Sequence, residues 1–144
     1  MQISPAIPLL RIFSEEHAKA FYVDFLGLSI EWGHRFADDL PLYAQARRGD
    51  LLIHLTGHHG DATPGSTVFV PVVGIESLCE ELNAKRYKHA RPAIQEQGWG
   101  KVMEIADPFG NRIRCMAKQS AIISVKAHGS HNRNIGRNKT NGFN

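Results

Sequence analysis

The chain of 144 residues is long enough for one ordinary domain with a hydrophobic core. Its 42% hydrophobic and 22% charged residues are typical of a globular protein and exclude a collagenous, coiled-coil or wholly disordered chain. The longest apolar run, residues 68–73, is far shorter than the roughly 20 residues that span a bilayer. Two isolated cysteines and a start without export features predict a reduced, cytoplasmic protein with no membrane partner.

Positive charge is concentrated at the C-terminal end. Residues 118–144 hold five lysines and arginines and no acidic residue, whereas residues 1–117 are slightly acidic. The same end has few large apolar side chains, so it cannot bury enough surface to offset the entropy lost on ordering. We therefore predict a folded domain over residues 1–117 and a largely disordered tail over residues 118–144, with residues 121–125 as a candidate extra strand. The spread of its cations is a poor match to a nucleic-acid site, and we expect no nucleic-acid partner.

The chain begins with signals for a strand and a helix. Residues 5–13 form an apolar run typical of a buried strand. Ser14 is suited to cap a helix, and the apolar stripe that follows at helical spacing ends at Gly27, which favours the left-handed conformation of a helix stop. We expect one amphipathic helix between these two residues.

Three strands follow in the first half. Over residues 28–36 the period changes to two, and residues 42–47 and 51–56 predict a hairpin around Gly49 and Asp50. In the first of these strands, strict alternation places Glu31 on one side and the apolar set on the other: Leu28, Ile30, Trp32, His34 and Phe36.

The second half repeats the order of the first. Its pattern predicts a strand, a helix, a poorly determined third element and two further strands, over residues 66–73, 75–86, 92–97, 101–106 and 111–116. The chain is therefore predicted to be an α+β protein of two βαβββ units, which form a curved mixed sheet. Each unit covers one sheet face with its helix, so the uncovered faces are the expected place of function.

Four motifs in this order carry a resemblance to a known family. They are Asp-Pro-Phe-Gly-Asn-Arg at 107–112, Phe-Tyr-Val-Asp-Phe-Leu-Gly at 21–27, Arg-Gly-Asp-Leu at 48–51, and Gln-Glu-Gln-Gly-Trp-Gly at 95–100. Residues 5–117 resemble the vicinal oxygen chelate superfamily, which includes glyoxalases and extradiol dioxygenases. Within it they look most like the bleomycin resistance branch.

The resemblance implies where a metal would bind. The enzymes of the superfamily hold a divalent ion at positions that correspond here to Ile7, His54, Thr67 and Arg114. Only His54 is a good metal ligand, and an arginine at such a position repels the cation. We therefore expect no metal, no cofactor and no catalytic residue.

A second group of possible metal ligands lies close to His54 in the sequence. It comprises His58, His59 and Asp61 among glycines and a proline. The spacing matches no established zinc pattern, and the turn residues account for the segment without a metal. We interpret it as a structured polar turn.

Three aromatic residues are candidates for ligand binding. Trp99 lies between two glycines in a polar segment, which favours display of the ring, and the equivalent tryptophan lines the drug groove in bleomycin resistance proteins. Trp32 and Phe36 are either core residues or part of the same groove. The full predicted ligand site is Trp99, Trp32, Phe36, Glu31, His54, Arg114 and Thr67.

The resemblance implies a protein that sequesters a bleomycin-like drug, without chemistry, in a groove between the subunits of a homodimer. Such ligands are flat and heteroaromatic with a cationic tail, and the acidic residues Glu31, Asp38 and Asp39 are compatible with one. One alternative is a metal-dependent enzyme of the glyoxalase or thiol-transferase kind that uses His54. Another is an interaction module whose basic tail docks on an acidic partner.

Overall fold

A computed structural model describes residues 1–118 of the chain. The predicted tail from residue 119 onward, with its candidate strand at 121–125, lies outside the described residues. Within residues 1–118, no helix has both the length and the apolar character needed to cross a bilayer.

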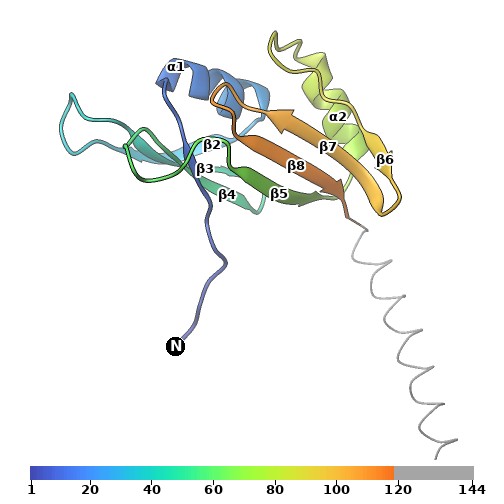
Figure 1. Ribbon diagram of the computed structural model, residues 1–144, viewed down its shortest axis with the longest axis horizontal. Helices are drawn as coiled ribbons and strands as arrows, with labels where there is room; N and C mark the ends of the chain where they lie inside the picture. Colours follow the sequence, from blue (N-terminus) through green and yellow to red (C-terminus); the bar gives the residue numbers. More distant parts are fainter. Residues whose placement is uncertain (119–144) are drawn as a thin grey trace, which may run out of the picture.

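The first unit follows the predicted order of strand, helix and three strands (Figure 1). Its strands pair in the order β1-β4-β3-β2, with β1 parallel to β4 and the other pairs antiparallel. Its elements are β1 (Leu9–Arg11), α1 (Glu15–Ala18), the π-helical stretch η1 (Lys19–Phe25), β2 (Ser29–His34), β3 (Tyr43–Arg48) and β4 (Leu51–Thr56).

The second unit repeats this arrangement with the strand order β5-β8-β7-β6, in which β5 is parallel to β8. The equivalence of the two sheets confirms the predicted α+β fold of two βαβββ units. Its elements are β5 (Thr67–Val72), α2 (Ile75–Ala84), β6 (Gln95–Gln97), β7 (Gly100–Ala106) and β8 (Arg112–Ala117).

The ends of the first helical segment agree with the sequence. The Ser14 hydroxyl accepts a 3.2 Å hydrogen bond from the backbone N–H of His17, which satisfies one free donor of the first turn. Gly27 adopts the left-handed conformation at φ +81°, where a side chain would be strained. Between these two residues the helix is wider than an α-helix, because the Leu26 N–H donates to the carbonyl of Phe21, five residues back instead of four.

The first strand is shorter than predicted. Only Leu9–Arg11 is a strand, whereas residues 1–6 are exposed and run away from the sheets as an arm (Figure 1). Pro5 and Pro8 have no backbone N–H to give to a neighbouring strand, although the Pro8 carbonyl still accepts from the N–H of His54. The prediction of one buried strand over residues 5–13 is therefore wrong, although the segment is apolar.

The strict alternation predicted for β2 is wrong. Ile30 pairs with the buried Ala46, but Trp32 pairs with the next residue of β3, Gln45, because Glu31 forms a bulge between them. Neighbouring residues of β3 point to opposite faces, so Trp32 lies on the face opposite to Ile30. Glu31 joins Trp32 there, since its carboxylate bonds to the Gln45 side chain.

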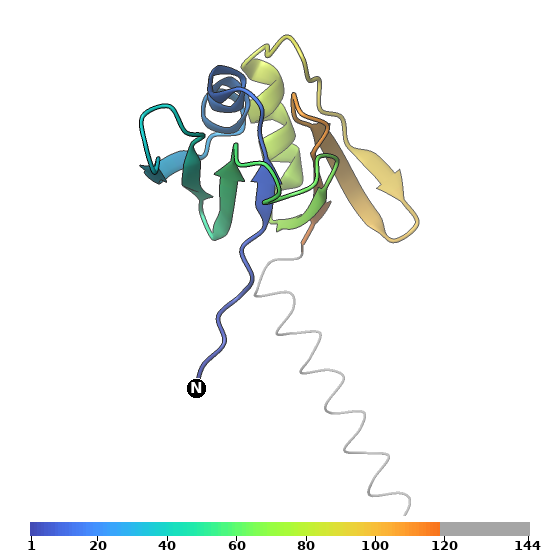
Figure 2. The same cartoon turned by 60° about the vertical axis from the view of Figure 1, so that its left-hand side comes forward.

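Each sheet is covered by helix on one face only, and the helical segments of both units lie on the same side of the molecule (Figures 1 and 2). The side chains beneath them form one buried cluster, in which Phe21, Ala46 and Met103 are fully shielded from solvent. We call the other side of the two sheets the open face. It displays alternate residues of the strands, apart from the bulge in β2.

The turn between β7 and β8 is held by its own side chains. One Asp107 carboxylate oxygen accepts hydrogen bonds of 2.8 Å from the backbone N–H groups of Phe109 and Asn111. The Asn111 amide then donates to the carbonyl of Arg11 in the other unit, at 2.9 Å. The 107–112 motif is therefore structural: it builds a hairpin turn and ties that turn to β1.

Candidate functional site

The open face of the first sheet carries a group of aromatic and polar side chains, which we call the platform: Trp32, Tyr43, Gln45 and His54. The Trp32 and Tyr43 rings stack, with centroids 5.9 Å apart and planes only 11° from parallel. The His54 ring meets Trp32 edge-on at 5.4 Å. Trp32 keeps 43% of its surface exposed, so the platform offers flat apolar area to a ligand.

A chain of hydrogen bonds fixes the polar half of the platform. The Gln45 amide nitrogen donates to the Glu31 carboxylate at 3.0 Å, which leaves the Gln45 carbonyl oxygen to accept from His54 Nε2 at 2.8 Å. His54 therefore carries its proton on Nε2, and its Nδ1 accepts from the Tyr43 hydroxyl at 2.6 Å. Both ring nitrogens of His54 are engaged within the protein.

Glu31 is a charged but compensated member of this chain. The Arg47 guanidinium Nε lies 3.1 Å from both of its carboxylate oxygens. The hydrogen bond from Gln45, and then Arg47, lower the pKa of Glu31 below its usual value. The negative charge of Glu31 is therefore already paired with Arg47, although the residue lies beside Trp32.

The open face of the second sheet carries two arginines and one glutamate. Arg114 Nε donates to one Glu104 oxygen at 2.8 Å, and Arg112 Nη1 lies 3.3 Å from the other. These contacts, chiefly that of Arg114, lower the pKa of Glu104. On the neighbouring strand, Thr67 is paired with Arg112 and Phe69 with Arg114.

The side chains at the positions implied for a metal do not fit one. Ile7 offers no donor, and Arg114 brings a positive charge that is already paired with Glu104. His54 has no ring nitrogen to spare. Thr67 would remain as the sole neutral oxygen donor, whereas a divalent ion needs three or four donors around one point.

The second histidine group forms a turn. The Thr56 hydroxyl donates to the Asp61 carboxylate at 2.6 Å and accepts from the backbone N–H of His58 at 3.1 Å. Within the part of the chain that the structure describes, no three His, Cys, Asp or Glu residues are grouped so as to hold a metal ion. The interpretation as a structured polar turn agrees with these contacts.

The remaining predicted residues are not members of the platform. Trp99 is 60% exposed in the turn between β6 and β7. Phe36 is 75% exposed beyond the end of β2, where its ring meets those of His34 and His58. The structure thus unites Trp32, Glu31 and His54, and Phe36 adjoins them through His34, the strand partner of Tyr43. Trp99 lies in the β6–β7 turn, and the pair Thr67 and Arg114 lies on the second sheet.

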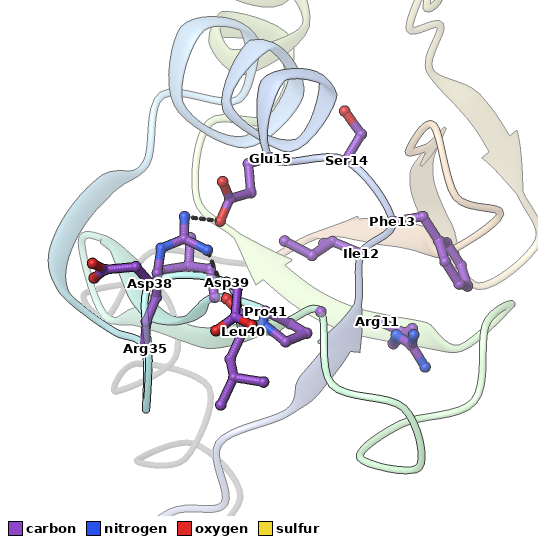
Figure 3. A pocket seen from close by; sticks show the side chains of 12 residues that line it. Arg11, Ile12, Phe13, Ser14, Glu15, Arg35, Asp38, Asp39, Leu40 and Pro41 are labelled. Atoms are coloured by element: carbon purple, nitrogen blue, oxygen red, sulfur yellow. Dashed lines mark hydrogen bonds and ion pairs between the residues drawn. The ribbon is translucent and has the colours of Figure 1, made fainter.

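Two cavities lie away from the predicted site residues. A cavity of about 340 Å³ lies where β1, α1 and the loop after β2 meet, and there Arg35 is ion-paired with Glu15 (Figure 3). Asp38 and Asp39 line this cavity. The larger, of about 750 Å³, lies between the β3–β4 turn, β5 and α2. None of the seven predicted ligand residues lines either cavity.

Sequence reasoning missed Tyr43, Gln45 and Phe69. A usable signal existed, because the hairpin register around Gly49 pairs Gln45 with His54 and so places Tyr43 and Gln45 on the same face as the histidine. Their hydrogen bonds to His54 required the folded structure.

Comparison with known proteins agrees with this architecture. No curated protein sequence matches the chain. The bleomycin-binding protein of Streptomyces verticillus, solved with copper(II)-bleomycin, is 25% identical with a TM-score of 0.63, over 83% of this chain and 99% of that one. A bleomycin resistance determinant encoded on transposon Tn5 is 20% identical with a TM-score of 0.66, over 82% and 100%.

A Streptomyces antibiotic-binding protein shares the fold as well, at 20% identity and a TM-score of 0.62, over 83% of this chain and 99% of that one. A family model described as glyoxalase superfamily protein matches residues 1–121. That match spans all of the described residues and both βαβββ units. The chain belongs to the glyoxalase superfamily.

Proposed function

We propose that this protein binds and sequesters a bleomycin-type or other flat aromatic drug, without chemical conversion, in a groove between two subunits. The observation that carries the proposal is the stacked pair of Trp32 and Tyr43 on the open face. Stacking of a planar ring on an exposed aromatic side chain contributes about 1–3 kcal/mol. The hydrogen bonds of His54 hold the Tyr43 ring in place, so little entropy is lost when a ligand stacks on it.

Similarity to known proteins supports the same ligand class. The Streptomyces verticillus protein is a bleomycin-binding protein solved with its drug, and a further relative is named as an antibiotic-binding protein. The absence of a fitting set of metal ligands at Ile7, His54, Thr67 and Arg114 favours binding over metal-dependent chemistry.

A homodimer would complete the groove. Every residue of β2 is exposed in the single chain, although this edge strand carries Ile30 and Trp32. The arm of residues 1–6 is exposed too, with Ile3 at 84%. Apolar edges of this kind favour pairing with a second chain. We expect light scattering at micromolar concentration to give a dimer mass, and a monomer mass would remove the intersubunit groove.

Calorimetric titration tests the proposed function directly. Metal-free and copper-loaded bleomycin, titrated into the full chain, are expected to bind with a fixed stoichiometry per dimer. Trp32→Ala should weaken binding about ten- to a hundredfold, because one stacking surface is lost. Phe13→Ala is the matched control, since Phe13 is an exposed aromatic next to Phe109 and away from the platform.

Two outcomes would contradict the proposal. One is that neither bleomycin nor other flat aromatic compounds bind the purified protein. The other is that the protein carries about one tightly bound divalent ion per chain after purification, which would favour the metal-dependent alternative.

A further inference from the structure

Two arginines share one carboxylate on the open face of the second sheet. Arg112 and Arg114 are alternate residues of β8, so both side chains leave the same face, and each contacts a different oxygen of Glu104. The three side chains remain 35% to 50% exposed. The cluster therefore presents one uncompensated positive charge to whatever occupies this face.

The arginines also have donors that the contacts with Glu104 leave unused. A guanidinium carries five N–H donors in a planar fork. Arg114 reaches Glu104 through Nε, and Arg112 reaches it through one Nη1 contact of 3.3 Å. The four N–H groups on the two Nη atoms of Arg114 make no hydrogen bond within residues 1–118, and one from each Nη forms the end-on edge that binds a carboxylate through two parallel bonds.

An exposed ring and a hydroxyl lie next to these donors. In the parallel pair of β5 and β8, Phe69 is the partner of Arg114, and Thr67 is the partner of Arg112. Partners on adjacent strands are about 4.8 Å apart, so side chains on the same face touch or nearly touch. Phe69 is 53% exposed, which is a large apolar surface to leave beside two cations.

We infer that the open face of the second sheet binds an aromatic anion: a flat ring that packs on Phe69 and bears an oxyanion, such as a carboxylate, held by Arg112 and Arg114. This inference rests on the proposed function and, among the flat aromatic drugs that it allows, favours one with an anionic group. The Thr67 hydroxyl supplies a further donor to the oxyanion. Among the described residues, the structure offers a cationic ligand no free carboxylate beside the platform, because the carboxylate of Glu31, which bonds to Gln45, is already paired with Arg47.

Three probes that differ in charge test the inference on the full chain. They are naphthoate, naphthamide and naphthylmethylammonium, which carry the same ring with a negative, neutral or positive group. Calorimetry should show naphthoate binding about tenfold more tightly than naphthamide, and the ammonium probe more weakly than the amide. The preference for the anion should shrink as NaCl rises from about 0.05 M to about 0.5 M, since the site is partly exposed.

The double variant Arg112→Gln with Arg114→Gln should lose the tenfold preference for naphthoate over naphthamide. Lys88→Gln, which removes an exposed charge in the loop after α2, should keep the preference. If all three probes bind equally well, or if the double variant still prefers naphthoate, the inference is wrong and the aromatic site remains. If none of the probes binds while bleomycin does, the inference is wrong and the proposed function stands; if bleomycin fails to bind as well, both fall.

Discussion

The hydroxyl of Tyr22 donates a 2.5 Å hydrogen bond to the carboxylate of Asp107, although the two residues are 85 positions apart. Tyr22 belongs to η1 of the first unit and Asp107 to the β7–β8 turn of the second. Both are buried, and the second bond to that carboxylate oxygen comes from the Asn111 amide. Burial and the adjacent Asp107 raise the pKa of Tyr22, so the hydroxyl keeps its proton and stays a donor.

Tyr22→Phe is expected to lower the free energy of unfolding by about 1–3 kcal/mol, because a buried carboxylate loses one of its donors. Guanidinium unfolding measures the change. Tyr87→Phe is the matched control: Tyr87 stacks on Phe25, and its hydroxyl has no hydrogen-bond partner within residues 1–118. Equal losses in the two variants would mean that the bond to Asp107 contributes nothing specific.

Trp99→Ala is expected to leave the melting temperature almost unchanged, because the ring is 60% exposed and its loss creates no cavity. Affinity for a flat aromatic ligand should fall about ten- to a hundredfold if Trp99 supplies a stacking surface at the edge of the groove. Calorimetry and thermal unfolding of the same sample separate the two effects. A large loss of stability with unchanged affinity would make Trp99 structural.

Arg114→Gln should raise the pKa of Glu104 toward its ordinary value of 4.5, since Arg114 is the main cause of its depression. A carboxylate with a depressed pKa stabilises the folded protein above the pKa of the unfolded chain, and this stabilisation disappears as the pH falls through the folded pKa. The stability difference between variant and parent should therefore shrink below about pH 4.5. Carboxyl NMR titration reports the pKa directly. Arg112→Gln should have the smaller effect, and the reverse order would contradict the observed geometry.

Burial raises the pKa of the Cys115 thiol to about 11, so almost no thiolate exists at pH 8. Iodoacetamide should therefore modify Cys115 only after unfolding. The half-buried Cys79 serves as the internal comparison for the extent of labelling. Peptide mass spectrometry with and without denaturant distinguishes the two sites. Rapid labelling of Cys115 in the folded protein would contradict its place in the core.

Features with local causes were predictable from the sequence alone. The Ser14 cap and the Gly27 stop follow from the side chain or conformational freedom of one residue. The β3–β4 hairpin follows from a turn signal between two short apolar runs. Repetition of these signals predicted the two βαβββ units, and the four motifs predicted the superfamily.

Features that depend on partners distant in sequence were decided by tertiary structure. The bulge at Glu31 carried Trp32 onto the open face, although periodicity alone placed it with Ile30. The compensation of Glu31 by Arg47 depended on how the strands pair, and so did the sharing of Glu104 by two arginines. The sequence establishes which residue types are present and their local conformation. Strand register determines which side chains contact each other, and these contacts set the charge balance and the hydrogen bonds of the open face.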